Sequence, residues 1–323
     1  MVRLADSHEK EALEMRTVYC QTLMQQAEQD SRIVVLNCDV SSSMGLKEFS
    51  RHFPEREINV GIMEANACGM AAGMSAAGLI PFFHTFSVFA TRRVCDQVFQ
   101  SCAYAGLNVK IIGGDAGITA TKNGGTHMPF EDIGIMRLIP GVTVMEPTDT
   151  TMMRSLVPQM VNTYGVQYMR FPRSQVPKIY ADGSEFSIGK SVLLREGTDA
   201  TIIASGIMVF EALKAAEILA QQNIQVRVVD MFTIKPLDQE QVIESAGKTG
   251  AVVTAENSQI AGGLGSAVAQ VLAERRPTPI EMVGIRDEFG EVGSQDYLAH
   301  RFGLTAEDIV QAVKRVQERK QSM

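Results

Sequence analysis

The sequence lacks several features that would place it in other broad classes of protein. It contains no stretch of about 18 uncharged apolar residues, so no membrane-spanning helix is expected. Its charged N-terminal segment has no apolar region of the kind found in secretory signals. The basic residues are spread along the chain and the net charge is -7, which argues against a nucleic-acid partner. We therefore expect a cytoplasmic protein that binds neither membranes nor nucleic acids.

Cysteine is also scarce. The five cysteines form no Cys-x-x-Cys pair and match no zinc-binding spacing. We expect free, partly buried thiols in a reducing compartment, and we assign no metal ligand to this chain.

What the sequence does contain is an alternation of continuous apolar runs with amphipathic, alanine-rich stretches. This alternation is typical of a parallel sheet covered by helices on both faces. It stops at residues 172–197, which hold two prolines and an Asp-Gly pair, and it restarts at residue 200. The pattern predicts two consecutive α/β domains, residues 1–185 and 186–323, each with a mostly parallel sheet.

Three segments near the ends of predicted strands carry residues suited to a ligand site, because parallel sheets bind ligands beyond their carboxyl ends. Glu64 begins a helix of small residues, although a carboxylate there can simply be a favourable charge near the helix dipole. Phe86 and Phe89 lie three residues apart, a spacing also common in cores but suited to stacking on a flat ring. His127 follows a Gly-Gly pair in the long loop of residues 113–133, where histidine is either a surface residue or functional.

In order and spacing these segments resemble the C-terminal half of transketolases, over nearly the whole chain. GIMEANACGMAAGMS resembles the region of the activating glutamate, TFSVF the aromatic stacking segment and GGTHMPFEDI the histidine loop. AGGLGSAVAQ is similar to the helix start of the family's C-terminal domain. The resemblance implies a pyrimidine-binding domain followed by a transketolase C-terminal domain, as also found in 1-deoxy-xylulose-5-phosphate synthases and 2-oxoacid dehydrogenase beta subunits.

The resemblance implies thiamine diphosphate as the cofactor. Glu64 would then contact the ring nitrogen of its aminopyrimidine, with Phe86 and Phe89 stacking on that ring. Asp39 would lie on the cofactor side, and His127 would contact the reacting oxygen as a proton carrier.

The same resemblance assigns substrate-binding residues. Ser43 and Arg173 match positions that hold the substrate phosphate, a role that suits arginine through bidentate hydrogen bonding. Asp115, Asn123 and His127 would face the sugar.

One expected part is absent from the sequence. Family members hold Mg²⁺ and the cofactor diphosphate through a Gly-Asp-Gly motif followed by Asn, and this sequence contains no such motif. The resemblance therefore implies a partner chain, an N-terminal transketolase subunit that carries this motif, in a heterotetramer of two copies of each chain.

The sequence departs from ordinary transketolases where the sugar would bind. Gly114 stands where they have His, and Asn123 stands where they have Asp. We therefore expect ketol transfer between sugar phosphates with an atypical donor: a branched, sulfonated or otherwise unusual ketose. The alternatives are a 1-deoxy-xylulose-5-phosphate synthase-like or 2-oxoacid dehydrogenase beta-type subunit, and, from another class, a non-catalytic binding or scaffold subunit.

Overall fold

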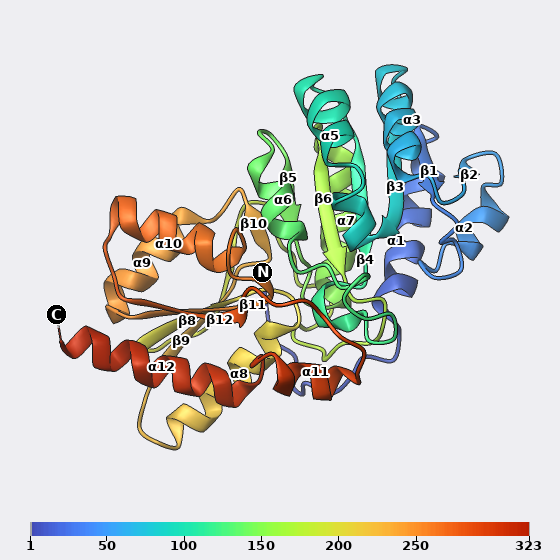
Figure 1. The fold of residues 1–323 in the computed structure, drawn as a ribbon. Coiled ribbons are helices and arrows are strands. Elements are labelled where there is room, and N and C mark those ends of the chain that lie inside the picture. Colours follow the sequence, from blue (N-terminus) through green and yellow to red (C-terminus); the bar gives the residue numbers. More distant parts are fainter. Residues whose placement is uncertain (1, 323) are drawn as a thin grey trace.

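The strands of the chain form two separate sheets in the computed structural model, which describes residues 2–322 (Figure 1). The first sheet contains β1 (Ile33–Asn37), β2 (Glu57–Asn59), β3 (Ile80–Phe86), β4 (Lys110–Gly114), β5 (Thr143–Met145), β6 (Gln167–Phe171) and β10 (Thr233–Lys235). The second contains β7 (Val192–Arg195), β8 (Ala200–Ala204), β9 (Val226–Asp230), β11 (Val252–Gln259) and β12 (Ile280–Ile285).

Both sheets are mostly parallel. The strand orders are β10-β5-β6-β4-β3-β1-β2 and β12-β11-β8-β9-β7. The only antiparallel pairs among these strands are β10 with β5 and β7 with β9, one at an edge of each sheet. The expected architecture of two mostly parallel α/β sheets in series is confirmed.

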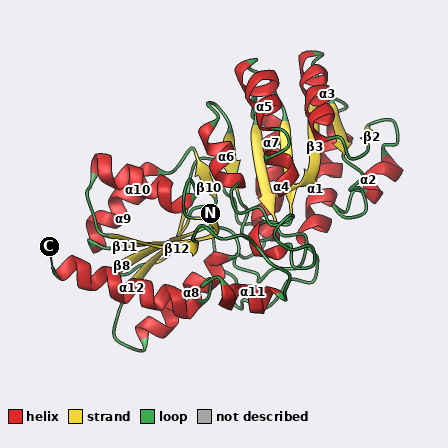
Figure 2. Ribbon diagram, viewed as in Figure 1, coloured by secondary structure: helices red, strands yellow, loops and turns green. Residues whose placement is uncertain are grey.

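Helices cover both faces of each sheet (Figure 2). Those of the first half are α1 (Met15–Gln29), α2 (Lys47–His52), α3 (Glu64–Ala76), α4 (Ser87–Thr91), α5 (Cys95–Gln97), α6 (Asp132–Leu138) and α7 (Thr150–Asn162). Those of the second half are α8 (Met208–Ala220), α9 (Gln239–Thr249), α10 (Leu264–Arg275), α11 (Gln295–Arg301) and α12 (Ala306–Gln321). Among residues 2–322, no helix combines the length and apolar character needed to cross a bilayer.

The continuous apolar strands have the burial that their sequence predicts, because consecutive side chains point to opposite faces and both faces are covered. In β1, Val35 joins the core that includes α1 and α7, whereas Val34 and Leu36 join the core that includes α3. In β8, Ile202 packs with α8 and α12, and Ile203 packs with α9 and α10. The helices thus hold each sheet rigid on both sides, and the strand ends remain available for function.

A buried polar cluster joins the two halves. Arg170 on β6 is fully buried, and its guanidinium lies 2.5 Å from the carboxylate of Asp132 and 3.3 Å from that of Glu146. It also donates a hydrogen bond of 2.8 Å to the main-chain oxygen of Asn257 on β11. The Asn257 side chain in turn accepts from the backbone N–H of Ile118 at 3.0 Å. The second half therefore holds the loop that follows β4.

Two segments differ from the sequence expectation. The sequence pattern of residues 92–105 predicts a single helix, but the structure has the short helix α5 and a π-helical segment, Val98–Tyr104, in this range, separate from α4. A π-helical turn accommodates one extra residue per turn and is common near functional sites. The break leaves Arg92 and Arg93 between α4 and α5. The linker predicted over residues 172–197 includes β7, which the sequence pattern missed because its backbone partner, β9, lies far away in the chain.

Candidate active site

The candidate site lies where three neighbouring strands of the first sheet end. Asp39 follows β1, Phe86 closes β3 and Asp115 follows β4, and these strands are adjacent in the order β4-β3-β1. Asp39 and Asp115 have φ angles of 60° and 61°, which non-glycine residues adopt rarely and often at functional sites. The sheet therefore brings together the segments that the sequence singled out.

A first pocket at this edge, the aromatic pocket, has a volume of about 270 Å³. Its lining includes Glu64, Phe86, Phe89 and His127, together with Asp39, Ser43, Cys38, Val40, Ile62, Thr85 and Arg93. The centroids of the Phe86 and Phe89 rings are 6.3 Å apart, and that of His127 lies 6.2 Å from Phe86 and 5.1 Å from Phe89. Six of the predicted site residues thus border one cavity.

Glu64 is the first residue of α3, and its side chain is only 4% exposed. Nη1 of Arg93 lies 3.0 Å from both of its carboxylate oxygens, and the Thr85 hydroxyl donates to one of them at 3.4 Å. The Arg93 guanidinium carbon lies 3.7 Å from the centroid of the Phe89 ring, and the side chain is 45% exposed. A buried carboxylate therefore faces a pocket whose aromatic wall is covered by a half-exposed arginine.

Arg93 is a site residue that the sequence reasoning missed. The signal was present in the pair Arg92-Arg93, which directly follows the aromatic segment. The break between α4 and α5, which turns Arg93 back towards Glu64, was not predictable from the helical pattern.

The aromatic pocket fits the aminopyrimidine of thiamine diphosphate. Phe86 and Phe89 are partly exposed rings on its wall, suitable for offset stacking against a flat heteroaromatic ring. The Glu64 carboxylate supplies a buried acceptor for a protonated ring nitrogen. In the part of the chain that the structure describes, no group of three or more His, Cys, Asp or Glu residues is arranged to hold a metal ion.

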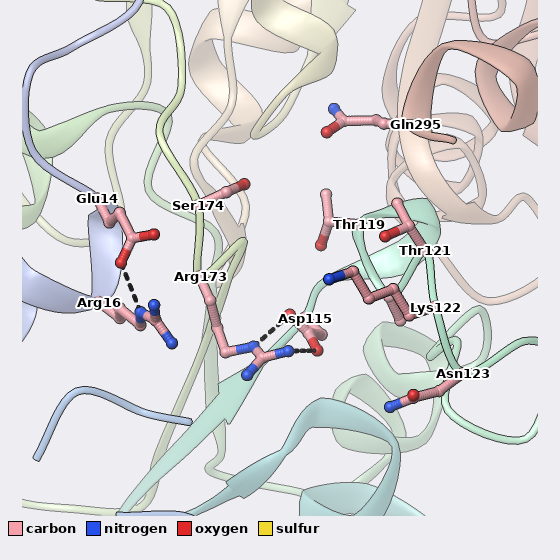
Figure 3. Close-up of a pocket in the computed structure, with 11 residues that line it drawn as sticks. Glu14, Arg16, Asp115, Thr119, Thr121, Lys122, Asn123, Arg173, Ser174 and Gln295 are labelled. Atoms are coloured by element: carbon pink, nitrogen blue, oxygen red, sulfur yellow. Dashed lines mark hydrogen bonds and ion pairs between the residues drawn. The ribbon is translucent and has the colours of Figure 1, made fainter. Parts of the chain in front are cut away.

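A second pocket, the basic pocket, has a volume of about 480 Å³. Figure 3 shows the residues that line it. Three cations line it, Arg16, Lys122 and Arg173, with two carboxylates, Glu14 and Asp115. Arg173 makes bidentate contacts to Asp115 at 2.6 and 2.7 Å, and Arg16 contacts Glu14 at 2.7 Å. The two ion pairs leave Lys122 as the cation without a carboxylate partner among residues 2–322, so the pocket favours an anion.

Arg173 connects the two pockets. Its guanidinium carbon lies 5.0 Å from the centroid of the Phe86 ring, and its Nη1 donates to the main-chain oxygen of Ser43 at 3.3 Å. Arg16 donates to the same oxygen at 2.9 Å. Sequence reasoning singled out Ser43 and Arg173 but missed Arg16, because nothing in its local sequence distinguishes it from a surface arginine at a helix start.

The predicted residue Asn123 lies at the basic pocket, and Gly114 directly precedes Asp115 of its lining. Asn123 is exposed and lines the cavity. A Cβ added at Gly114 would overlap the Met44 sulfur and would lie 3.4 Å from Cγ of Arg173. A histidine, as expected for ordinary transketolases at this position, therefore has no room while Met44 occupies its place.

His127 lies at the end of the glycine-rich loop, on the wall of the aromatic pocket. Its Nδ1 is 2.9 Å from the Thr126 hydroxyl, and its backbone N–H donates to the oxygen of Gly124 at 3.0 Å. Gly124 has a φ angle of 71°, which glycine adopts without strain. The turn thus directs the imidazole towards the two phenylalanine rings.

The chain matches two known domain families along its length. Residues 11–178 match the family described as "Transketolase, pyrimidine binding domain". Residues 189–309 match "Transketolase, C-terminal domain".

Three known proteins illustrate the similarity. A 6-deoxy-6-sulfo-D-fructose transketolase subunit of Clostridium sp. (strain MSTE9) is 54% identical over 95% of both chains. A 1-deoxy-D-xylulose-5-phosphate synthase of Geobacter sulfurreducens (strain ATCC 51573 / DSM 12127 / PCA) is 36% identical over 92% of this chain but only 47% of its own length. A solved structure described as a split gene transketolase, inactive beta4 tetramer, superposes with a TM-score of 0.89 at 42% identity, covering 95% of this chain and 99% of that chain.

Proposed function

The chain belongs to the transketolase family, and from this premise we propose that it is the C-terminal subunit of a split transketolase. In this role it transfers a two-carbon ketol unit between sugar substrates by means of thiamine diphosphate. The observation that carries the proposal is the pair of adjoining pockets, one aromatic with a buried carboxylate and one basic, with Arg173 between them. A reactive ring bound in the first would face a sugar whose charged end lies in the second.

Thiamine diphosphate, when bound, supplies the stabilisation of the carbanion, and the chain orients and tunes it. Glu64 is proposed to hold the aminopyrimidine through its buried carboxylate, with Phe86 and Phe89 stacking on the ring. Asp39 is proposed to shape the cofactor side of the pocket, where its backbone N–H donates to the side-chain oxygen of Asn59 at 3.2 Å.

On the substrate side, His127 is proposed to move a proton to or from the reacting oxygen, because its imidazole borders both phenylalanines. Arg173 and Ser43 are proposed to bind the charged end of the sugar. Asp115 fixes the Arg173 guanidinium through two hydrogen bonds, and Asn123 is proposed to contact a sugar hydroxyl.

The proposal includes a partner chain. The sequence carries no Gly-Asp-Gly…Asn motif, so the diphosphate and Mg²⁺ would be held by an N-terminal transketolase subunit. The similarity to a solved split gene transketolase supports this division. We expect a heterotetramer of two copies of each chain, with 1–185 and 186–323 as the two domains of this subunit. A cytoplasmic location is supported by the five free thiols.

The proposed donor is a ketose with an anionic end, and a sulfonated ketose is preferred over an ordinary sugar phosphate. Two observations support this preference. The 54% identical relative is described as acting on 6-deoxy-6-sulfo-D-fructose. In addition, Gly114 stands where ordinary transketolases have a histidine that helps to bind phosphate, and Met44 occupies the space that a side chain at this position would need.

The decisive experiment is co-purification of this chain from its native extract, followed by a thiamine-diphosphate-dependent ketol-transfer assay. We expect a second chain that bears Gly-Asp-Gly…Asn, and turnover of 6-deoxy-6-sulfofructose at lower KM than xylulose 5-phosphate. A chain that purifies alone and binds the cofactor unaided would contradict the split-enzyme proposal.

A second candidate function is favoured by the similarity to 1-deoxy-D-xylulose-5-phosphate synthase. That reaction releases carbon dioxide from pyruvate, whereas ketol transfer from a ketose does not. Incubation of the reconstituted complex with pyruvate and glyceraldehyde 3-phosphate, with carbon dioxide as the readout, separates the two functions.

A further inference from the structure

A segment of the second domain reaches the substrate side of the first. Residues 287–295, here called the strap, follow β12 and lead into α11, and they lie against the glycine-rich loop. The backbone N–H of Gly293 donates to the oxygen of Thr121 at 3.2 Å. A Cβ added at Gly125 would overlap the main-chain oxygen of Gly290, so the two backbones are in direct contact. The strap therefore fixes the loop that carries Lys122.

The last residue of the strap, Gln295, lines the basic pocket together with Lys122 and Arg173. Figure 3 shows Gln295 and Lys122 on the same side of the pocket, across from Arg173, with the Lys122 amine pointing towards Asp115. Among the residues that the structure describes, 2–322, Gln295 is the only one of the second domain in this lining. Both domains therefore contribute to the wall of one cavity.

The positive charges of the two arginines in this pocket are already paired with carboxylates, Arg173 with Asp115 and Arg16 with Glu14. Nε and Nη2 of Arg173 are bonded to Asp115, and its Nη1 is bonded to Ser43. Arg16 is bonded to Glu14 and to the same Ser43 oxygen. A sulfonate or phosphate end carries a negative charge on three acceptor oxygens, so it is bound best where a cation without a carboxylate partner also contacts it.

We propose that Lys122 and Gln295 recognise the anionic end of the ketose, so that the C-terminal domain takes part in selecting the substrate. Lys122 supplies the charge, because its exposed amine forms no hydrogen bond or ion pair within residues 2–322. Gln295 supplies a neutral amide donor from the opposite domain. The Gly293–Thr121 hydrogen bond holds the two at a fixed separation. The inference rests on the proposed ketol transfer.

The test compares two donors on the enzyme reconstituted with its partner: 6-deoxy-6-sulfofructose, which is anionic, and erythrulose, which is neutral. Lys122→Gln and Gln295→Glu should each raise KM for the anionic donor by about tenfold, the loss expected for one exposed charge-assisted contact. We expect kcat to change by less than about twofold, and both constants for erythrulose to stay as in the wild type.

Asp296→Asn, next to Gln295 but outside the basic pocket, is the matched control and should change neither KM. An unchanged KM for the anionic donor in both variants, or an equal rise for both donors, would overturn the inference while leaving ketol transfer intact. If no ketose is turned over by the wild type, the proposed function fails instead. Binding of inorganic phosphate to the same complexes, measured by calorimetry, then still tests the site, and equal affinity in wild type and variants would overturn it.

Discussion

Each domain buries a glutamate near the start of a helix, and the two differ in what their carboxylates face. Glu64, at the start of α3, is 4% exposed, borders the aromatic pocket and is held by a half-exposed Arg93. Glu256, on β11, is fully buried and accepts hydrogen bonds from the backbone N–H groups of Leu264 and Gly265 at 2.8 and 2.7 Å. The Glu64 carboxylate can still accept a hydrogen bond from a ligand in the pocket, whereas the Glu256 carboxylate binds the N-terminus of α10.

The same contrast applies to the sheet edges as a whole. In the first domain the strands end at Asp39 and Asp115, beside cavities. In the second, Asp230 at the end of β9 and Asn257 near the end of β11 are completely buried, at the contact with the first domain. Both sheets thus carry polar side chains at the carboxyl ends of their parallel strands. The edge of the second sheet is buried by the first domain, so only the edge of the first sheet is accessible to a ligand.

The largest expected effect comes from replacing each of the two glutamates by glutamine and comparing the losses of activity and of stability. Glu64→Gln should lower kcat of the reconstituted enzyme by roughly a thousandfold, since Gln does not share a proton with the aminopyrimidine. Its free energy of unfolding should change by less than about 1 kcal/mol. Glu256→Gln should show the reverse: a loss of about 1–3 kcal/mol, from an amide facing two N–H donors, with kcat changed by less than about twofold.

Both variants are measured by chemical denaturation and by the ketol-transfer assay. Full turnover by Glu64→Gln would remove the proposed role of this residue. A large loss of activity in Glu256→Gln, with stability unchanged, would mean that the second domain's edge is not purely structural.

The next effect concerns two arginines that pair with carboxylates. Arg170→Met should lower the free energy of unfolding by about 3–5 kcal/mol, because the carboxylates of Asp132 and Glu146 would remain buried without their cation. Arg93→Met should cost less than about 1 kcal/mol, because its guanidinium is half-exposed. Urea unfolding of the two variants gives the comparison, and an equal or greater loss for Arg93→Met would contradict it.

A smaller effect is the pH dependence set by Asp230. Burial raises the pKa of Asp230 to about 7, so the folded chain binds a proton that the unfolded chain, with an ordinary carboxyl pKa, releases. The stability contributed by this proton is fully present below about pH 4 and is lost as pH rises through 7. Asparagine does not titrate, so Asp230→Asn removes this loss. At pH 8 its free energy of unfolding should exceed that of the wild type by about 2 kcal/mol, after subtraction of the cost of burying an amide N–H without an acceptor.

Thermal unfolding of wild type and Asp230→Asn at a series of pH values between 4 and 8 measures this difference. The advantage of the variant should disappear towards pH 4. Parallel curves for the two proteins over the whole range would show that Asp230 does not titrate there.

The smallest effect is expected at the aromatic wall. Phe89→Ala should weaken thiamine diphosphate binding by about tenfold, since an aromatic contact contributes about 0.5–1.5 kcal/mol beyond its buried area. Phe210→Ala, a partly buried aromatic on α8 outside the aromatic pocket, is the control. Equal affinities for the two variants, measured by fluorescence titration of the complex, would argue against stacking on Phe89.

Much of the first sheet's edge was accessible from the sequence. Glu64, the two phenylalanines and His127 lie in motifs whose order is specific, and the alternation of strands and helices predicts that they share one edge. Parallel strands all end on the same side, so local patterns are enough to collect residues from distant segments.

The remaining features of the site and of the sheets depend on tertiary contacts that are not visible in the local sequence pattern. Arg16 reaches the site only because α1 packs beside the loop of Ser43, and Gln295 only because the strap crosses between domains. β10 joins the first sheet although the alternation places it among second-domain elements. These features follow from tertiary packing, which residue periodicity does not encode.

The hydrogen bonds of Asn257 have a consequence for recombination between related genes. The loop after β4 is anchored by this side chain and by the close contact of Gly125 with Gly290, so its shape is encoded on both sides of the interdomain connection. A chimera in which residues 186–323 come from a homologue also takes from that homologue the residues that hold this loop. Such a chimera is expected to keep its function only when it retains Asn257 and the two glycines that face each other, Gly125 and Gly290.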